Sequence, residues 1–119
     1  MVKRLITDDD VNAYCKAAGG SPEYARYVLA QMKPGLRERV LRAARSRSRG
    51  RGLLRDPIEV DPSTRKLVRQ AAAEANRVVP FTGLGTCHSV WHQQARILWK
   101  EHKIRWYSPA EMNPAVEFD

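Results

Sequence analysis

Hydrophobic residues recur at helical spacing along most of the chain. In segment 8–18 four apolar residues lie at i, i+3, i+4 and i+7, the spacing of one helix face: Val11, Tyr14, Cys15 and Ala18. Thr7 is suited to cap this helix, and Gly19-Gly20 is suited to end it. A second helix is predicted over residues 22–31, facing inward with Tyr24, Tyr27, Val28 and Met32.

Three helix starts share one pattern, a capping residue followed by proline at the first helical position: Ser21-Pro22, Asp61-Pro62 and Ser108-Pro109. A further helix begins near Pro34, and its buried side is predicted to be Leu36, Val40, Leu41 and Ala44. Residues 108–111 also match a capping box, since Glu111 follows Ser108 by three positions.

Two longer helices are predicted in the second half of the chain. Residues 62–79 carry one apolar stripe: Leu67, Val68, Ala71, Ala72, Ala75, Val78 and Val79. Residues 87–102 offer Val90, Trp91, Ala95, Leu98 and Trp99 as core candidates. Four short segments suit strands: 2–6, 58–60, 104–107 and 115–119. The expected fold is mainly α, about five helices in one small domain, with a short two- or three-stranded sheet as an optional addition.

Length and composition narrow the class of protein. The 119 residues suit a single domain spanning 1–119, and no apolar run approaches the roughly 18 residues of a membrane span. The first ten residues turn acidic too early for a secretory leader, so a cytoplasmic location is expected. Cys15 and Cys87 are too few for a disulfide framework and are expected to be thiols.

The positive charge is concentrated in one segment. The chain has a formal net charge of +8, and residues 37–55 hold eight arginines against Glu38 alone. This block contains no lysine, and arginine offers a planar five-donor fork that matches phosphate or carboxylate. Because arginines surround the predicted helix by its last turns, residues 42–55 are expected to project as a basic arm or loop.

This block supplies the candidate nucleic-acid contacts. They are Arg37, Arg39, Arg42, Arg45, Arg47, Arg49, Arg51 and Arg55, with Arg26 and Lys33 as supplements. Arginines that neutralise phosphates bind without sequence preference and gain from counterion release. Residues 8–33 also match a helix-turn-helix loosely, in which Arg26, Gln31 and Lys33 would face the DNA groove. Plain packing of two short helices explains the same pattern.

A Cys/His group could carry chemistry instead. His88 and His92 lie at i, i+4, a spacing that lets two imidazoles share a metal, and Cys87 precedes them at a predicted helix start. His102 lies about 15 Å further along the helix and cannot join them. A helix-face pair is the simpler interpretation, so we predict no catalytic residue, no metal and no cofactor.

The sequence favours a small basic nucleic-acid-binding protein, with DNA preferred to RNA, acting as a non-enzymatic accessory or regulatory factor. Small basic chains of this kind are typical of phages and plasmids. One alternative is an interaction module or inhibitor that docks an acidic protein surface. A second is a small enzyme dependent on Cys87, His88 and His92 or on a metal. Trp91 and Trp99 are expected in the core, while base stacking remains open for Trp106 and Tyr107.

Overall fold

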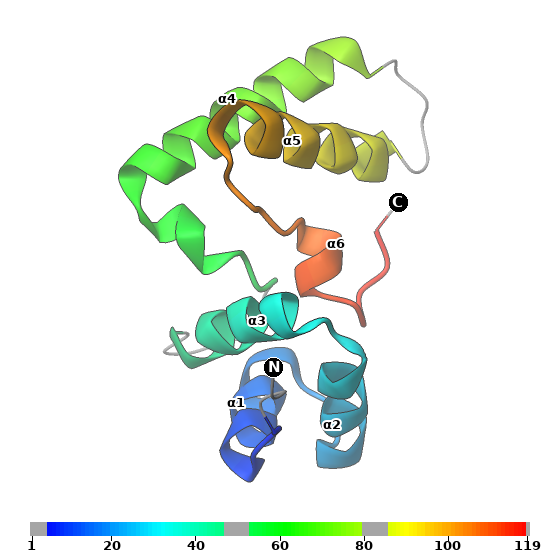
Figure 1. The fold of residues 1–119 in the computed structure, drawn as a ribbon. Coiled ribbons are helices and arrows are strands. Elements are labelled where there is room, and N and C mark those ends of the chain that lie inside the picture. The colour runs from blue at the N-terminus through cyan, green and yellow to red at the C-terminus, as the bar shows by residue number, and fades with distance from the viewer. Residues whose placement is uncertain (1–4, 47–52, 80–85, 119) are drawn as a thin grey trace.

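The computed structural model describes residues 5–46, 53–79 and 86–118 (Figure 1). These residues form a mainly helical fold, as predicted. The helices are α1 Asp8–Ala18, α2 Pro22–Gln31, α3 Pro34–Ser46, α4 Pro62–Val78, α5 Thr86–His102 and α6 Pro109–Met112, with a short 3-10 helix, η1 Pro57–Val60. The described residues contain no strand, so the optional sheet is not supported, and segment 58–60 belongs to η1.

The predicted helix starts are confirmed. Thr7 accepts a hydrogen bond from the Asp10 backbone N–H while Asp10 accepts from that of Thr7, which makes a capping box on α1. Ser108 and Glu111 form the equivalent box on α6. Asp61 caps α4, and the Thr64 backbone N–H that it accepts lowers the pKa of its carboxyl. Local sequence therefore sets where these helices begin.

The first three helices enclose one hydrophobic cluster. Its centre includes Tyr14, Leu29 and Leu41, one from each helix, and α3 lies across the α1 and α2 pair (Figure 1). The predicted inward face of α2 is wrong in part, because Tyr24 and Tyr27 are exposed and Ala25, Val28, Leu29 and Met32 are buried. A buried tyrosine needs a hydrogen-bond partner for its hydroxyl, whereas these apolar side chains need none. The helix therefore turns its apolar face inward and leaves the two tyrosines exposed.

Helices α4 and α5 pack together around a second cluster. Val68, Ala71 and Ala75 of α4 meet Val90, Ile97 and Leu98 of α5, and buried Gln94 donates to the Val68 carbonyl oxygen at 2.9 Å. Trp106 completes this cluster and is 6% exposed, whereas Trp99 is 49% exposed. The prediction that Trp99 is a core residue is therefore wrong, because its position on α5 lies outside the α4 contact.

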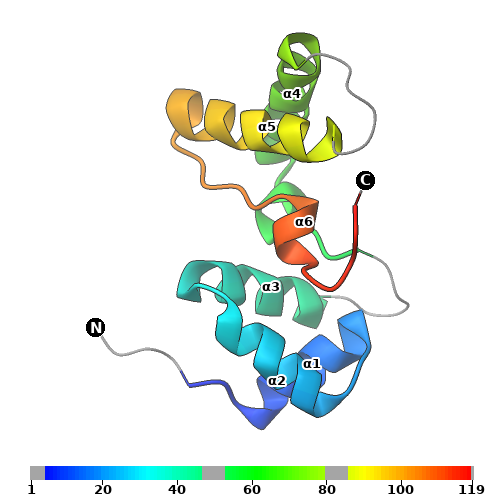
Figure 2. The ribbon, with the colours of Figure 1, turned by 90° about the vertical axis from the view of Figure 1, so that its right-hand side faces the viewer.

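The segment before η1 and helix α6 join the two clusters. Figures 1 and 2 show α6 between α3 and the α4–α5 pair. Asn113, directly after α6, accepts from the Leu54 backbone N–H and donates to the Leu54 carbonyl oxygen, both at 2.8 Å. Leu54 and Met112 are both buried in the first cluster.

The expected basic arm needs a correction. Residues 42–46 continue α3, where Ala43 and Ala44 are buried, and Leu54 and Asp56 are buried as well. These four residues pack against the body because they are small, apolar or a paired acid, although arginines stand next to them in the sequence. Residues 47–52 of the predicted arm lie outside the described residues.

Candidate functional site

The arginines of α3 have partners within the protein. Arg37 is buried and donates to the Leu29 carbonyl oxygen at 3.3 Å. Arg45 forms an ion pair with Asp10, whose side chain is 1% exposed. The expectation that Arg37 projects towards a ligand is therefore wrong, since its side chain is enclosed. Arg45 is partly exposed, and Asp10 offsets its charge.

Arg39 and Asp56 form the polar junction between the two helical groups. Arg39 Nη1 donates to both carboxylate oxygens of Asp56, at 2.8 and 2.7 Å, and to the Arg105 carbonyl oxygen at 3.0 Å. Asp56 also accepts the backbone N–H of Ile58 at 3.2 Å and that of Tyr107 at 2.9 Å. The carboxylate is fully buried, so this set of hydrogen bonds supports a charge that would otherwise be costly to bury.

The remaining predicted contacts are distributed over the molecule. Arg26 donates to the Ile6 carbonyl oxygen at 3.1 Å and pairs with exposed Asp8 at 2.7 Å. Lys33, Arg42 and Arg55 are exposed, and none of them has an ion-pair partner in segments 5–46, 53–79 and 86–118. Arg47, Arg49 and Arg51 lie outside the described residues.

A cleft of about 760 Å³ opens between the two helical groups, next to this junction. Ala43 and Ser46 of α3 line one side, and four residues of α4 line the other: Arg65, Val68, Arg69 and Ala72. Leu53, Arg55 and η1 contribute further lining, and Trp91, Gln94 and Trp106 are also exposed to the space. The volume lies within the usual range of ligand clefts.

Three arginines line this cleft: Arg55, Arg65 and Arg69. Arg65 is held by hydrogen bonds to backbone carbonyl oxygens, Glu59 at 2.9 Å and Val60 at 3.5 Å. Within the described residues none of the three is paired with a carboxylate. Their positive charge is therefore available to an anion.

The acids of the cleft are engaged elsewhere. Asp56 is paired with Arg39, and Glu59 Oε2 accepts the indole N–H of Trp106 at 2.9 Å. Glu59 has no ion-pair partner among the described residues, so three guanidinium groups face one carboxylate that lacks a cationic partner. The cleft is cationic for this reason.

Sequence analysis missed Arg65 and Arg69. Residues 56–119 have no net charge as a whole, so the sum over this segment gave no signal. Helix α4 nevertheless carries four cations within about 120° of its circumference: Arg65, Lys66, Arg69 and Arg77. The i, i+4 spacing of Arg65 and Arg69, on the flank of the apolar stripe of α4, is the signal that identifies them.

The Cys/His group does not assemble into a metal site. His88 Nε2 lies 2.9 Å from the Phe118 carbonyl oxygen, and the His88 ring packs edge-on against Trp91 at 5.7 Å. Across the described segments, no group of three or more His, Cys, Asp or Glu side chains could hold a metal ion. Cys15 and Cys87 are half-buried thiols. Residues 83–85 of the glycine-rich turn lie outside the described residues.

Comparisons with protein-family models, with curated proteins and with solved structures found no match for this chain. In the part of the chain that the structure describes, none of the helices has the length and hydropathy needed to cross a bilayer. A proposal of function therefore depends on the chemistry of the site.

Proposed function

We propose that this protein binds nucleic acid through phosphate contacts made by the arginines of the cleft. Arg55 and Arg69 have no partner within the described residues, and Arg65 is oriented by backbone carbonyl oxygens that leave its charge unneutralised. The observation that carries the proposal is this set of guanidinium groups, which the protein itself does not pair. Arginine favours phosphate because its planar fork donates two parallel hydrogen bonds to two oxygens.

The net charge of +8 supports the same function by attracting a polyanion over a longer range. Arg42 and Lys33 are exposed and extend the set of available cations, and Arg47, Arg49 and Arg51 remain sequence-based candidates. We expect the protein to act as an accessory or regulatory factor and not as an enzyme, with DNA preferred to RNA.

The test is a titration of a fluorescent DNA duplex of mixed sequence at several salt concentrations. In R55A/R65A/R69A we expect at least about tenfold weaker binding, and a plot of log K against log salt that is less steep by up to about 3, since each phosphate contact contributes about 0.9. The control is K16A/R96A/K100A, which removes the same charge from exposed positions that do not line the cleft.

Equal losses in the two triple variants would show that the net charge acts without the cleft. If the wild-type protein binds neither duplex nor single strands at 50 mM salt, the proposal is wrong, and an acidic protein surface becomes the better candidate partner. All six substituted side chains are exposed, so circular dichroism should show the same helical content in every variant.

A further inference from the structure

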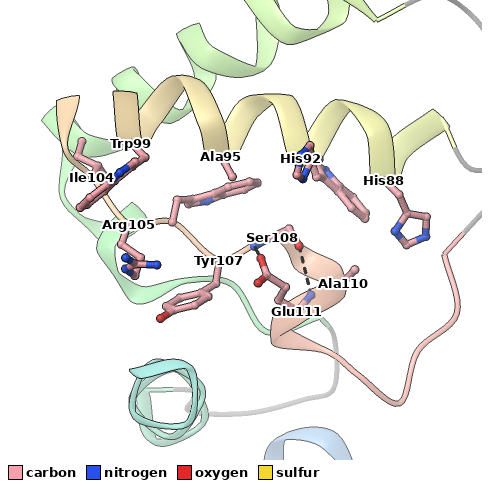
Figure 3. Close-up of a pocket in the computed structure, with 12 residues that line it drawn as sticks. His88, His92, Ala95, Trp99, Ile104, Arg105, Tyr107, Ser108, Ala110 and Glu111 are labelled. Carbon is pink, nitrogen blue, oxygen red and sulfur yellow. Dashed lines mark hydrogen bonds between the residues drawn. The ribbon is translucent and has the colours of Figure 1, made fainter. Parts of the chain in front are cut away.

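A second hollow, which shares Trp91 and Trp106 with the cationic cleft, is lined by aromatic side chains. This groove has a volume of about 400 Å³ and lies between α5 and residues 104–111. Figure 3 shows His88, His92 and Trp99 of α5 on one side and Arg105 and Tyr107 on the other. Because Trp91 and Trp106 line both spaces, the groove and the cleft are neighbours.

The turn after α5 brings the two walls of the groove together. Lys103 adopts a left-handed backbone conformation, with φ of 55°. The backbone N–H of Lys103 bonds to the Trp99 carbonyl oxygen at 3.0 Å, and that of Ile104 bonds to the Leu98 carbonyl oxygen at 3.1 Å. The chain therefore reverses at once and runs back along α5, as Figure 3 shows. A lysine rarely adopts this conformation, which favours glycine.

Trp99 is the exposed tryptophan of this groove. Its side chain is 49% exposed although it is large and apolar. The Arg105 guanidinium lies 5.0 Å from the centre of the Trp99 ring, and Lys103 Nζ lies 5.6 Å from it. Both cations are exposed and neither has an ion-pair partner in the described part of the chain. Both cations lie over the indole ring as cation–π contacts, and such a site suits a ligand whose negative charge pairs with the cations while its aromatic ring stacks on the indole.

The other groups of the groove are consistent with such a ligand. Glu111 is the acid among the residues that line it, and its carboxylate accepts the Ser108 backbone N–H at 3.0 Å in the α6 capping box. A cationic ligand would be repelled by Arg105 and Lys103, and a purely apolar ligand would leave both cations unpaired. A nucleotide satisfies both requirements, since its base can stack on the indole while its phosphate meets a cation.

We propose that this groove takes an unpaired nucleobase, so that the preferred ligand is a nucleic acid with a single-stranded segment. This inference depends on the proposed function and adds the class of substrate. The arginines of the cleft contact phosphates in any nucleic acid, whereas the groove requires a base that is not paired, because a base within a duplex presents no free face. A strand with phosphates in the cleft can place one base in the neighbouring groove.

The experiment compares a fluorescent 12-nucleotide single strand with a duplex of the same sequence, as DNA and as RNA. We expect the wild-type protein to bind the single strand more tightly than the duplex. W99A should lose about 5- to 150-fold in single-strand affinity, the range of one base–aromatic stacking contact, and keep its duplex affinity within twofold. W99F should retain much of the single-strand affinity because it retains a ring.

K103G provides an independent variant that leaves the fold unstrained. Glycine accepts the left-handed conformation at this position, so the turn is retained while one cation beside Trp99 is removed. We expect a smaller loss of single-strand affinity than in W99A, together with unchanged thermal stability. R55A/R65A/R69A should bind both the single strand and the duplex more weakly.

The outcomes separate the two proposals. The proposal that the groove takes a base is wrong if W99A keeps its single-strand affinity. The proposed function still stands in that case, provided that duplex binding requires the three cleft arginines. Absence of binding to every DNA and RNA probe would overturn both. The DNA and RNA arms show which backbone the groove prefers.

Discussion

Helices α3 and α4 both carry rows of arginine, but the two rows have different surroundings. On α3, the side chains of Arg37, Arg39 and Arg45 contact a backbone carbonyl oxygen or the buried carboxylates Asp56 and Asp10. On α4, Arg65 and Arg69 face a cleft, and neither is paired with a carboxylate among the described residues. The residue type is the same, and the electrostatic role is different.

The comparison shows that the density of arginine along a chain is a poor guide to which arginines lack an acidic partner. The α3 block has the higher density, yet much of its charge supports the fold by pairing with acids from α1 and from the segment before η1. The α4 row is sparser, but its charge remains available. What decides the role is the position of the acids in space.

The largest expected effect comes from removing the main carboxylate that anchors α3. D56A should lower the free energy of unfolding by about 3–5 kcal/mol, because Arg39 would keep a partly buried charge and the Tyr107 backbone N–H would lose its acceptor. Urea denaturation measures this loss. D61A, which removes an exposed helix cap, should lower stability by much less. Similar losses in the two variants would contradict the role of Asp56 as a junction.

The same conservative substitution, arginine to lysine, should have different effects on α3 and on α4. R39K should cost about 1–2 kcal/mol of stability, because lysine cannot reproduce contacts with both Asp56 oxygens and the Arg105 carbonyl oxygen. R69K should change stability by less than about 0.5 kcal/mol and keep most of the DNA affinity. Denaturation and the duplex titration check both outcomes. A stable R39K protein would show that the Arg39 geometry matters less than its charge.

A smaller effect is expected within α3 itself. R45A should lower stability by about 1 kcal/mol, since the Arg45 side chain is partly exposed although its partner Asp10 is buried. R42A, on the same helix, should change stability by less than about 0.5 kcal/mol because Arg42 is exposed and unpaired within the described residues. Thermal unfolding of the two variants side by side is the measurement. If R42A proves the more damaging, the assignment of partners on α3 is wrong.

The smallest effect concerns alkaline pH and the first hydrophobic cluster. Burial, with smaller contributions from Tyr24 and Cys15, raises the pKa of Tyr14 above its ordinary value of 10.0. The folded state therefore holds this proton more tightly than the unfolded state, and the stabilisation is full below pH 10 and is lost as the pH rises through the folded-state pKa. Y14F should unfold at a slightly higher pH than the wild type. Y27F, at an exposed position, should not.

Much of the fold could be predicted from local sequence. The starts of α1, α2, α4 and α6 followed from capping residues and proline, whose backbone preferences act within one helical turn. The choice of buried face was less secure. Helix α2 carries two overlapping apolar stripes, and α5 carries Trp91 and Trp99 on the same side, so only the packing partner selects Leu29 over Tyr27 and leaves Trp99 exposed.

The candidate site was predicted only in its chemistry. Composition alone indicated an arginine-rich protein suited to polyanions, because the net charge is a sum over residues and does not depend on where they lie in space. Which arginines are available depended on tertiary structure, since Asp10 meets Arg45 across 35 positions and Asp56 meets Arg39 across 17. Ion pairs form between groups that are close in space, so the sequence determined the helices and the charge, and the fold decided which charges remain unpaired.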